Sequence, residues 1–359
     1  RDRPYRDFYI THDEAQNLEI LQNKLGGANI TFTDPQHSVK RQITSARPEQ
    51  KHNIVIVLME SMSAKFLTEN RYPGQQTITP NLDRLSREGL FFSQTYASGT
   101  RSVRGIEAVT LSMPPLPGQS IVRRPGNENL YSLGKIFADK GYDNKWIYGG
   151  YGYFDNMNYF LGHNGFQVVD RGAWQEGEIT FANAWGAADG DTFAKVIKEA
   201  DKSYEAGQPF LTFLLTISNH RPYTYPEGKI DLSGGREGGV KYADYAIGEF
   251  LKQAEKKPWF DNTLFVFVAD HTAGAAGDEE IDLEGHHIPW IIYAPKLVKA
   301  QRIDTPVSQL DVLPTLLGLL NFNYESRFYG QDALAANYES RFFVSNFQKA
   351  VSYTHLRAH

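Results

Sequence analysis

Two polar pairs with the side-chain types of a metal site stand directly after apolar runs of the sequence. Glu60 and Ser61 follow the run 53–59, and Asp270 and His271 follow the run 263–269. A carboxylate at the end of a buried strand is costly unless it is paired or bound to a cation. Carboxylate oxygen and imidazole nitrogen together suit a divalent ion such as Zn²⁺ or Mn²⁺. Taken alone, each pair could equally be a helix cap, an ion pair or an ordinary loop.

Two further polar clusters lie beside apolar runs. His220 ends a Ser-Asn-His sequence after the run 210–216, and His286 and His287 precede the run 288–293. Packing or surface placement would explain each cluster by itself. If the four clusters share one edge of a sheet, they predict a metal site there.

A hydroxyl-rich stretch supplies a candidate nucleophile. Residues 97–105 contain Thr100 and Ser102 just before a helical pattern. The first turn of a helix favours anions because its backbone amides are free. A hydroxyl bound to a divalent cation has a lowered pKa and can attack near neutral pH. A plain helix N-cap is the alternative for the same residues.

The apolar runs predict an α/β fold with a central, mostly parallel sheet flanked by helices on both faces. Continuous apolar runs are typical of strands buried on both faces, and helical patterns separate them. Ligands bind at the carboxyl ends of such strands, so the polar clusters should converge. The expected strands are 53–59, 145–148, 210–216, 263–269 and 288–293, and the expected helices are 13–24, 79–87, 240–256 and 310–320.

The ends of the chain differ from its middle. The chain starts at Arg1 without a signal-peptide pattern, so we expect a fragment whose targeting segment lies upstream. Residues 351–359 continue no strand or helix pattern, and we expect no function for His355 and His359. The expected parts are an N-terminal helical arm and linker (1–50), a catalytic domain (51–322), and a partial, truncated C-terminal subdomain with a tail (323–359).

The composition excludes several classes of protein. With 359 residues, 41% hydrophobic and 22% charged, the chain can bury a large core and is neither disordered nor a coiled coil. The net charge of −5 argues against a nucleic-acid partner. The absence of cysteine excludes thiolate catalysis, Cys-ligated zinc and disulfides. No apolar run approaches the ~20 residues of a membrane helix.

In order and spacing, seven short motifs between about residues 50 and 322 resemble the alkaline phosphatase/sulfatase-like superfamily. The closer resemblance is to the lipoteichoic acid synthase and membrane-anchored phosphoglycerol transferase family. Each motif is weak alone, but the ordered set is specific. The motifs are Leu58-Met59-Glu60-Ser61, the segment 79–85, Gly99-Thr100-Arg101-Ser102, Ser218-Asn219-His220, Ala269-Asp270-His271, His287-Ile288-Pro289, and the segment 308–311 with Pro314-Thr315-Leu316.

The resemblance implies roles for the residues of these motifs. Glu60, Asp270 and His271 are the implied metal ligands, for Mn²⁺ or Zn²⁺, with Mg²⁺ a further candidate. The nucleophile, which also touches the metal, lies in the Gly-Thr-x-hydroxyl stretch. Family members use its second hydroxyl, which favours Ser102 over Thr100, although that position is usually Thr.

Substrate contacts are implied around the same site. His220 is similar to a histidine that binds phosphate or protonates the leaving group, and either His286 or His287 occupies the region of a further active-site histidine. Lipoteichoic acid synthases grip glycerophosphate with a Trp and an Arg. At the similar stretch this chain offers Phe154 and Asn156, and Arg104 is a candidate for the missing charge, with a solvated helix face as the alternative.

The function implied by the resemblance is metal-dependent transfer of a phosphoglycerol-type headgroup from a lipid or glycan donor, through a covalent phospho-Ser or phospho-Thr intermediate. A phosphodiesterase or sulfatase-like hydrolase is one alternative, and an inactive headgroup-binding module is another. True sulfatases need Cys/Ser-x-Pro-x-Arg, and Ser102-Val103-Arg104 lacks the Pro. Phosphoethanolamine transferases of this superfamily usually carry disulfides, which this chain cannot form, so phosphoglycerol transfer is favoured.

The resemblance also implies a location and partners. The chain is expected to be the extracytoplasmic domain of a protein anchored in the bacterial inner membrane by segments upstream of Arg1, facing the periplasm. The expected partner is a phospholipid or glycan substrate. No oligomeric state is predicted.

Overall fold

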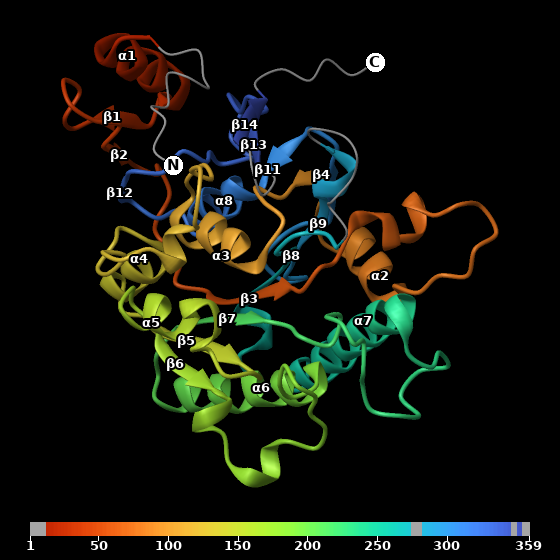
Figure 1. Cartoon of the computed structure of the whole chain (residues 1–359). Helices are drawn as coiled ribbons and strands as arrows, with labels where there is room; N and C mark the ends of the chain where they lie inside the picture. The colour runs from red at the N-terminus through yellow and green to blue at the C-terminus, as the bar shows by residue number, and fades with distance from the viewer. Residues whose placement is uncertain (1–11, 274–281, 346–349, 354–359) are drawn as a thin grey trace.

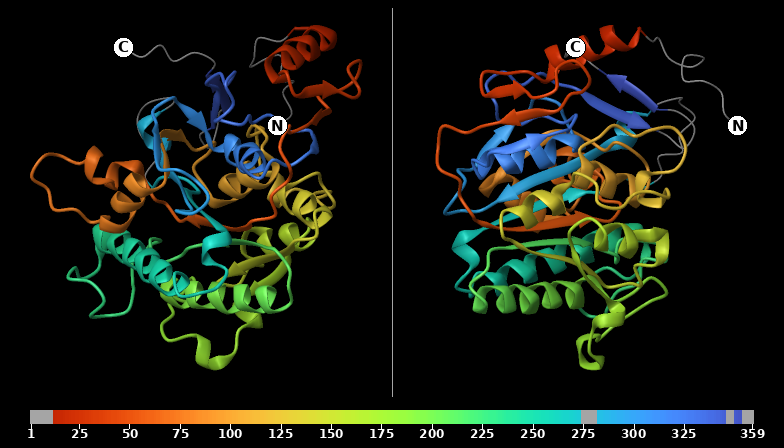
Figure 2. Two further views of the ribbon diagram at one scale, coloured as in Figure 1. Left: turned by 180° about the vertical axis from the view of Figure 1, so that it is seen from behind. Right: turned by 90° about the vertical axis from the view of Figure 1, so that its left-hand side faces the viewer.

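A computed structural model describes residues 12–273, 282–345 and 350–353. A central nine-stranded sheet is covered by helices on both faces (Figures 1 and 2), which confirms the α/β prediction. In order across the sheet, the strands are β10 (Gln301–Ile303), β4 (Leu90–Tyr96), β9 (His287–Tyr293), β8 (Thr263–Ala269), β3 (Asn53–Met59), β7 (Phe210–Leu215), β5 (Asp143–Tyr148) and β6 (Gln167–Asp170), with β11 (Val307–Ser308) also paired to β4.

The sheet is mostly parallel, as predicted, with one reversed strand. β9 runs antiparallel to both of its neighbours, β4 and β8. The other pairings of the sheet are parallel. In the register of β3 and β8, Met59 lies opposite Ala269. The next residue on each strand, Glu60 and Asp270, therefore leaves the sheet at the same edge.

Helices form a layer on each face of the sheet. α6 and α7 pack together on one face, while α3 and α8 lie on the other (Figures 1 and 2). The helix predicted at 240–256 begins earlier, and the one predicted at 310–320 opens with a 3₁₀ turn, Gln309–Asp311. The helices are α1 (Glu14–Leu25), α2 (Pro80–Glu88), α3 (Ser102–Leu111), α4 (Leu133–Asp139), α5 (Met157–Gly162), α6 (Asp189–Glu205), α7 (Gly235–Ala254) and α8 (Val312–Leu319).

The two end regions of the chain meet in a small separate sheet. β1 (Ile30–Phe32) and β12 (Tyr324–Ser326) both pair antiparallel with β2 (Arg41–Ile43), so β2 lies between them. The arm before the large sheet and the segment after α8 are thus joined by backbone hydrogen bonds.

The last described segment forms a hairpin-like pair, β13 (Phe342–Ser345) with β14 (Ala350–Tyr353). The prediction that residues 351–359 continue no strand is wrong for 351–353, because a four-residue stretch gives too little pattern to recognise. His355 and His359 lie outside the described residues. Within the part of the chain that the structure describes, no helix is both long enough and apolar enough to cross a membrane.

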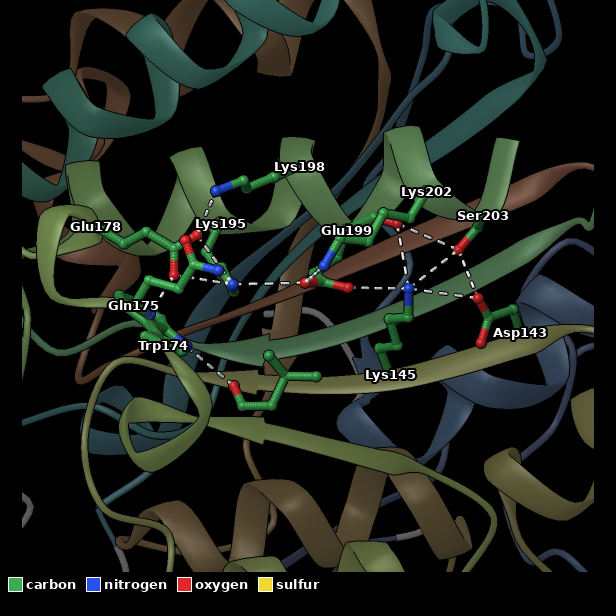
Figure 3. A network of polar contacts seen from close by, with 11 residues as sticks. Asp143, Lys145, Trp174, Gln175, Glu178, Lys195, Lys198, Glu199, Lys202 and Ser203 are labelled. Atoms are coloured by element: carbon green, nitrogen blue, oxygen red, sulfur yellow. Dashed lines mark hydrogen bonds and ion pairs between the residues drawn. The ribbon is translucent and has the colours of Figure 1, made fainter. Parts of the chain in front are cut away.

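A network of buried charges fastens α6 to β5 (Figure 3). Glu199 of α6 forms ion pairs with Lys145 of β5 at 3.0 Å and with Lys195 at 3.5 Å. Lys195 also lies 3.0 Å from Glu178, at the end of the 3₁₀ turn Glu176–Glu178. The side chains of Lys145, Lys195 and Glu199 are each at most 7% exposed. Their charges are therefore stabilised by the opposite charges of the network rather than by water.

Candidate active site

Glu60, Asp270 and His271 meet at the carboxyl ends of β3 and β8. One potential ligand atom from each residue lies within 4.8 Å of the others. His271 Nε2 is 3.8 Å from Glu60 Oε1 and 3.4 Å from Asp270 Oδ2. The structure thus brings together, in space, three residues that are far apart in sequence.

Asp270 is the most buried member of this cluster. Its Oδ1 accepts hydrogen bonds from the backbone amides of Ser61 (2.8 Å) and His271 (2.7 Å). Its Oδ2 is buried and has no hydrogen-bond partner among the described residues. An oxygen in this state beside a second carboxylate and an imidazole matches the donor set of a divalent cation, so the residues fit a metal.

The electrostatics of the cluster point the same way. Burial first, and then the charge of Glu60, raise the pKa of Asp270 well above its usual range. Burial by itself lowers the pKa of His271, but the carboxylates of Asp270 and Glu60 outweigh it and the net pKa is raised. Two carboxylates held this close inside the protein need a positive charge between them. A bound cation would supply it.

The ring orientation of His271 suits a metal ligand. Its Nδ1 lies 2.6 Å from the backbone oxygen of Thr272, which can only accept. In the neutral ring that nitrogen therefore carries the proton, and the lone pair of Nε2 faces the two carboxylates. Fixing the tautomer through the second nitrogen is the usual arrangement of histidine ligands.

Glu60 is held by contacts from neighbouring loops. Its backbone amide donates to Thr216 Oγ1 (2.9 Å), and its carbonyl accepts from Asn219 Nδ2 (3.0 Å). Ser61 donates its hydroxyl to Glu60 Oε1 at 2.7 Å. Ser61 itself has φ +51°, a left-handed conformation that is uncommon outside glycine. Such backbone strain is concentrated at functional sites.

Ser102 is the hydroxyl that joins the cluster. It is the first residue of α3, and its Oγ donates to Glu60 Oε2 at 3.2 Å. α3 can approach this closely because residue 105 is glycine: a Cβ there would lie 2.7 Å from Asp270 Cα. Ser102 lines the small cavity beside the cluster, whereas Thr100 is not among its lining residues.

That cavity has a volume of about 40 Å³ and lies against Glu60 and Ser102. Two predicted substrate residues, Phe154 and His220, also line it. His220 Nδ1 lies 2.8 Å from the backbone oxygen of Arg221, so Nδ1 carries the proton in the neutral ring and Nε2 is the atom left for substrate. The remaining lining residues are Tyr148, Asp155, Met157, Trp185, Leu215, Thr216 and Ile217.

Two other predicted substrate residues are engaged elsewhere. Asn156 donates its side-chain amide to the backbone oxygen of Val122 at 2.8 Å and does not line the cavity. Arg104 forms an ion pair with buried Glu107 at 2.9 Å and also donates to two backbone carbonyls. Its guanidinium holds the loop after α3 and is neither a solvated helix face nor aimed at the cavity.

The histidine pair at the start of β9 also contacts backbone oxygens. His286 is buried, with Nδ1 2.7 Å from the oxygen of Asp282 and Nε2 3.2 Å from that of Ser345. His287 Nε2 lies 2.7 Å from the oxygen of Ser93. Neither lines the cavity. The structure therefore does not bring His286 or His287 to the cluster.

The sequence patterns missed three side chains of the cavity wall. Trp185 packs on the ring of His220, with centroids 4.2 Å apart, and against Phe154 at 5.5 Å. Tyr148 is the last residue of β5, a strand-end position that the pattern of the other clusters could have identified. Trp185 lies in an irregular segment and Asp155 in the short 3₁₀ helix Phe154–Asn156, and periodicity marks neither of them.

Comparison with known proteins places the chain in a family. A family model described as Sulfatase matches residues 52–322, so the chain belongs to the sulfatase family. A crystal structure of an alkaline phosphatase superfamily protein from Vibrio parahaemolyticus is similar, with a TM-score of 0.89 and 32% identity over 97% of this chain and 86% of that one. These findings confirm the resemblance predicted from the motifs.

Curated relatives extend the comparison. The chain is 24% identical over 348 residues to lipoteichoic acid synthase 2 of Bacillus subtilis, covering 87% of this chain and 52% of that protein. It is 26% identical over 336 residues to phosphoglycerol transferase I of Xanthomonas campestris, covering 84% and 45%. The chain thus spans about half the length of these relatives.

Proposed function

We propose that this chain is a metal-dependent transferase of phosphoglycerol-type headgroups, with Ser102 as its nucleophile. The observation that carries the proposal is the 3.2 Å contact between Ser102 Oγ and Glu60 Oε2, inside the cluster with Asp270 and His271. The names of the two curated relatives support the same chemistry. A sulfatase activity is disfavoured because Arg104 stands where the sulfatase motif has its proline.

Glu60, Asp270 and His271 would hold the ion, which is Mn²⁺ or Zn²⁺, with Mg²⁺ a further candidate. When bound, a divalent cation lowers the pKa of a neighbouring hydroxyl and offsets negative charge on phosphate oxygens. Ser102 Oγ, whose proton would pass to solvent water when the ion binds, would form a bond to phosphorus while the bond to the donor alcohol breaks. Ser102 is the first residue of α3, so the positive end of the helix dipole favours negative charge at this position.

His220 would transfer the protons of the leaving group and of the acceptor. In its protonated form it gives the Nε2 proton to the departing oxygen of the donor. In the second displacement an acceptor hydroxyl returns a proton to Nε2 and attacks phosphorus, which releases Ser102. Trp185, packed on the imidazole, keeps the ring turned toward the cavity. If water takes the acceptor's place, the same two steps give a phosphodiesterase.

The nucleophile assignment is tested by Ser102→Ala. We expect the variant to lose all measurable turnover of bis-(p-nitrophenyl) phosphate with added Mn²⁺, while its metal content by elemental analysis stays at the wild-type level. Thr100→Ala is the matched control and should retain activity, because Thr100 does not line the cavity. A fully active Ser102→Ala variant would remove Ser102 from the mechanism.

The acceptor is tested by product analysis. Incubation of a phosphoglycerol lipid with and without a glycan or glycerol acceptor separates the outcomes: transfer gives a new phosphodiester that depends on the acceptor, and hydrolysis gives free glycerophosphate alone. An inactive headgroup-binding module would give neither. The extracytoplasmic location and an upstream membrane anchor stay predictions from the family resemblance.

A further inference from the structure

A second cavity lies between the N-terminal arm and the segment after α8. Its volume is about 400 Å³, within the range of small-ligand sites, which is roughly 300–1,000 Å³. β2, β12 and the end of α8 contribute to its wall. None of its lining residues lines the catalytic cavity, so it is a separate site.

The wall of this arm cavity contains a buried cation for which the described residues supply no counterion. Arg41 of β2 is only 2% exposed. Its two terminal nitrogens donate to the backbone oxygens of Val39 (3.1 Å) and Phe328 (2.8 Å). Its Nε is buried without a hydrogen-bond partner, and no carboxylate among the described residues forms an ion pair with it. Neutral carbonyls do not balance a buried charge, so the site lacks an anion.

The same wall also offers acceptors for hydroxyl groups. Gln331 donates Nε2 to the backbone oxygen of Lys24 at 2.7 Å, and its buried Oε1 has no hydrogen-bond partner in the part of the chain that the structure describes. Asp332 lines the cavity as well, and its Oδ1 accepts from the backbone amide of Leu334. A ligand that fits this wall must therefore carry an anionic group for Arg41 and hydroxyl donors for Gln331 and Asp332.

We propose that the arm cavity is a binding site for a small phosphorylated polyol, with the phosphate on Arg41 and the hydroxyl groups on Gln331 and Asp332. Arg–phosphate contacts are charge-assisted and strong, and they would satisfy the orphaned Nε. The hydroxyl contacts would satisfy the orphaned amide oxygen. A bare anion would leave Gln331 unpaired and would face the carboxylate of Asp332. Binding at the arm cavity does not depend on any step of the proposed phosphoryl transfer.

Binding of sn-glycerol 3-phosphate, glycerol and inorganic phosphate to the full chain tests this proposal, by calorimetry in EDTA to suppress metal-dependent binding at the catalytic cavity. We expect glycerol 3-phosphate to bind at least about tenfold tighter than glycerol or phosphate. Arg41→Gln should weaken its binding at least about tenfold. The control His220→Ala, which alters only the catalytic cavity, should leave the affinity unchanged.

A second variant guards against misfolding of Arg41→Gln. Ala335 lines the arm cavity, and Ala335→Phe fills it without removing any side-chain hydrogen bond. This variant should also lose at least about tenfold in affinity. Equal binding of phosphate and glycerol 3-phosphate would overturn the polyol assignment. Binding that is absent, or that is lost in His220→Ala and kept in Ala335→Phe, would overturn the site. A failed transferase assay would leave these results unaffected.

Discussion

At the scale of single residues, the two oxygens of Asp270 have different surroundings. Oδ1 is fixed by two backbone amides, whereas Oδ2 is buried beside Glu60 without a hydrogen-bond partner among the described residues. Within this carboxyl group, Oδ1 therefore has a structural role and Oδ2 the role of a metal ligand. Asparagine at this position keeps the oxygen that accepts the two backbone hydrogen bonds, but it replaces the ligand oxygen with an amide nitrogen.

Asp270→Asn should therefore lower bound metal while leaving the fold intact. We expect wild-type protein to melt at a higher temperature when Mn²⁺ is added, because an ion that binds only the folded state stabilises it. The variant should lose most of this shift and most of its metal by elemental analysis. In EDTA it should melt no lower than wild type, since one of two neighbouring buried negative charges is gone.

Asp189→Asn is the matched control for this experiment. Asp189 is also a buried aspartate with an unpartnered Oδ2, and its Oδ1 holds the amides of Ile217 and Ser218. It lies outside the metal-type cluster. Its variant should keep the Mn²⁺ response. Equal metal content in wild type and Asp270→Asn would contradict the ligand role of Asp270.

Only some residues of the candidate site could be predicted from the sequence. Glu60 and Asp270 were predictable because they end adjacent apolar strands, and the strand register determines where they meet. Ser102 was predictable as a hydroxyl at a helix start. Trp185 was not, because its position depends on how one irregular loop packs on another. For His286 or His287 the sequence predicted a place in the site, but both side chains contact backbone oxygens, which a histidine near a strand end can do just as well.

At the scale of elements, the closeness of α3 to β8 depends on Gly105. A Cβ at this position would lie 2.7 Å from Asp270 Cα, a backbone atom that cannot rotate away. Gly105→Ala should push α3 outward and move Ser102 away from Glu60. We expect a loss of about 1–3 kcal/mol in unfolding free energy, and a larger proportional loss of kcat/KM on bis-(p-nitrophenyl) phosphate.

Gly162→Ala is a suitable comparison for that variant. Its new methyl group would meet Val168 at 3.4 Å, an ordinary contact, so activity and stability should stay near wild type. If Gly105→Ala had the same activity as Gly162→Ala, the tight packing of α3 would not be what positions Ser102.

The attachment of α6 to β5 depends on the charge of Glu199 (Figure 3). Glu199→Gln keeps the shape of the side chain but leaves Lys145 and Lys195 with fewer counter-charges in a buried place. We expect a loss of about 2–4 kcal/mol in unfolding free energy, measured by urea denaturation. Glu249→Gln removes an exposed pair with Lys252 and should cost no more than about 0.5 kcal/mol. Equal effects of the two substitutions would show that the buried network contributes no more than a surface pair.

Elements were predictable from sequence where a single property sufficed. The continuous apolar runs of β3 and β8 identify buried strands, but they carry no information on direction, so the reversal of β9 could not be inferred. The sequence analysis did not predict β4, because the strand ends in polar residues that are typical of a loop. Its place between β10 and β9 is decided by tertiary pairing.

At the scale of the whole molecule, acid stability should depend on Glu178. Burial by itself would raise its pKa, but hydrogen bonds from Lys198, the Gln175 amide and Lys195 outweigh it and lower the pKa to about 2. A carboxylate with a depressed pKa stabilises the fold fully above its ordinary pKa of 4.5. This contribution is lost as the pH falls from 4.5 toward 2.

Urea denaturation of wild type and Glu178→Gln across this window tests the point. The wild type should be the more stable protein at about pH 6, and the difference should shrink steadily toward about pH 3, because glutamine does not titrate. A difference that stays constant with pH would mean that the contribution of Glu178 is not electrostatic.

The small sheet of β1, β2 and β12 determines where this protein can be cut. A gene fragment trimmed to the 52–322 match would discard β1 and β2 at one end and β12 at the other. The trimmed polypeptide would also lose the walls that β2 and β12 contribute to the arm cavity, and Phe322 on the remaining wall would meet solvent. A fragment made for expression should therefore keep both flanking segments, because the small sheet needs β1 and β2 from one segment and β12 from the other.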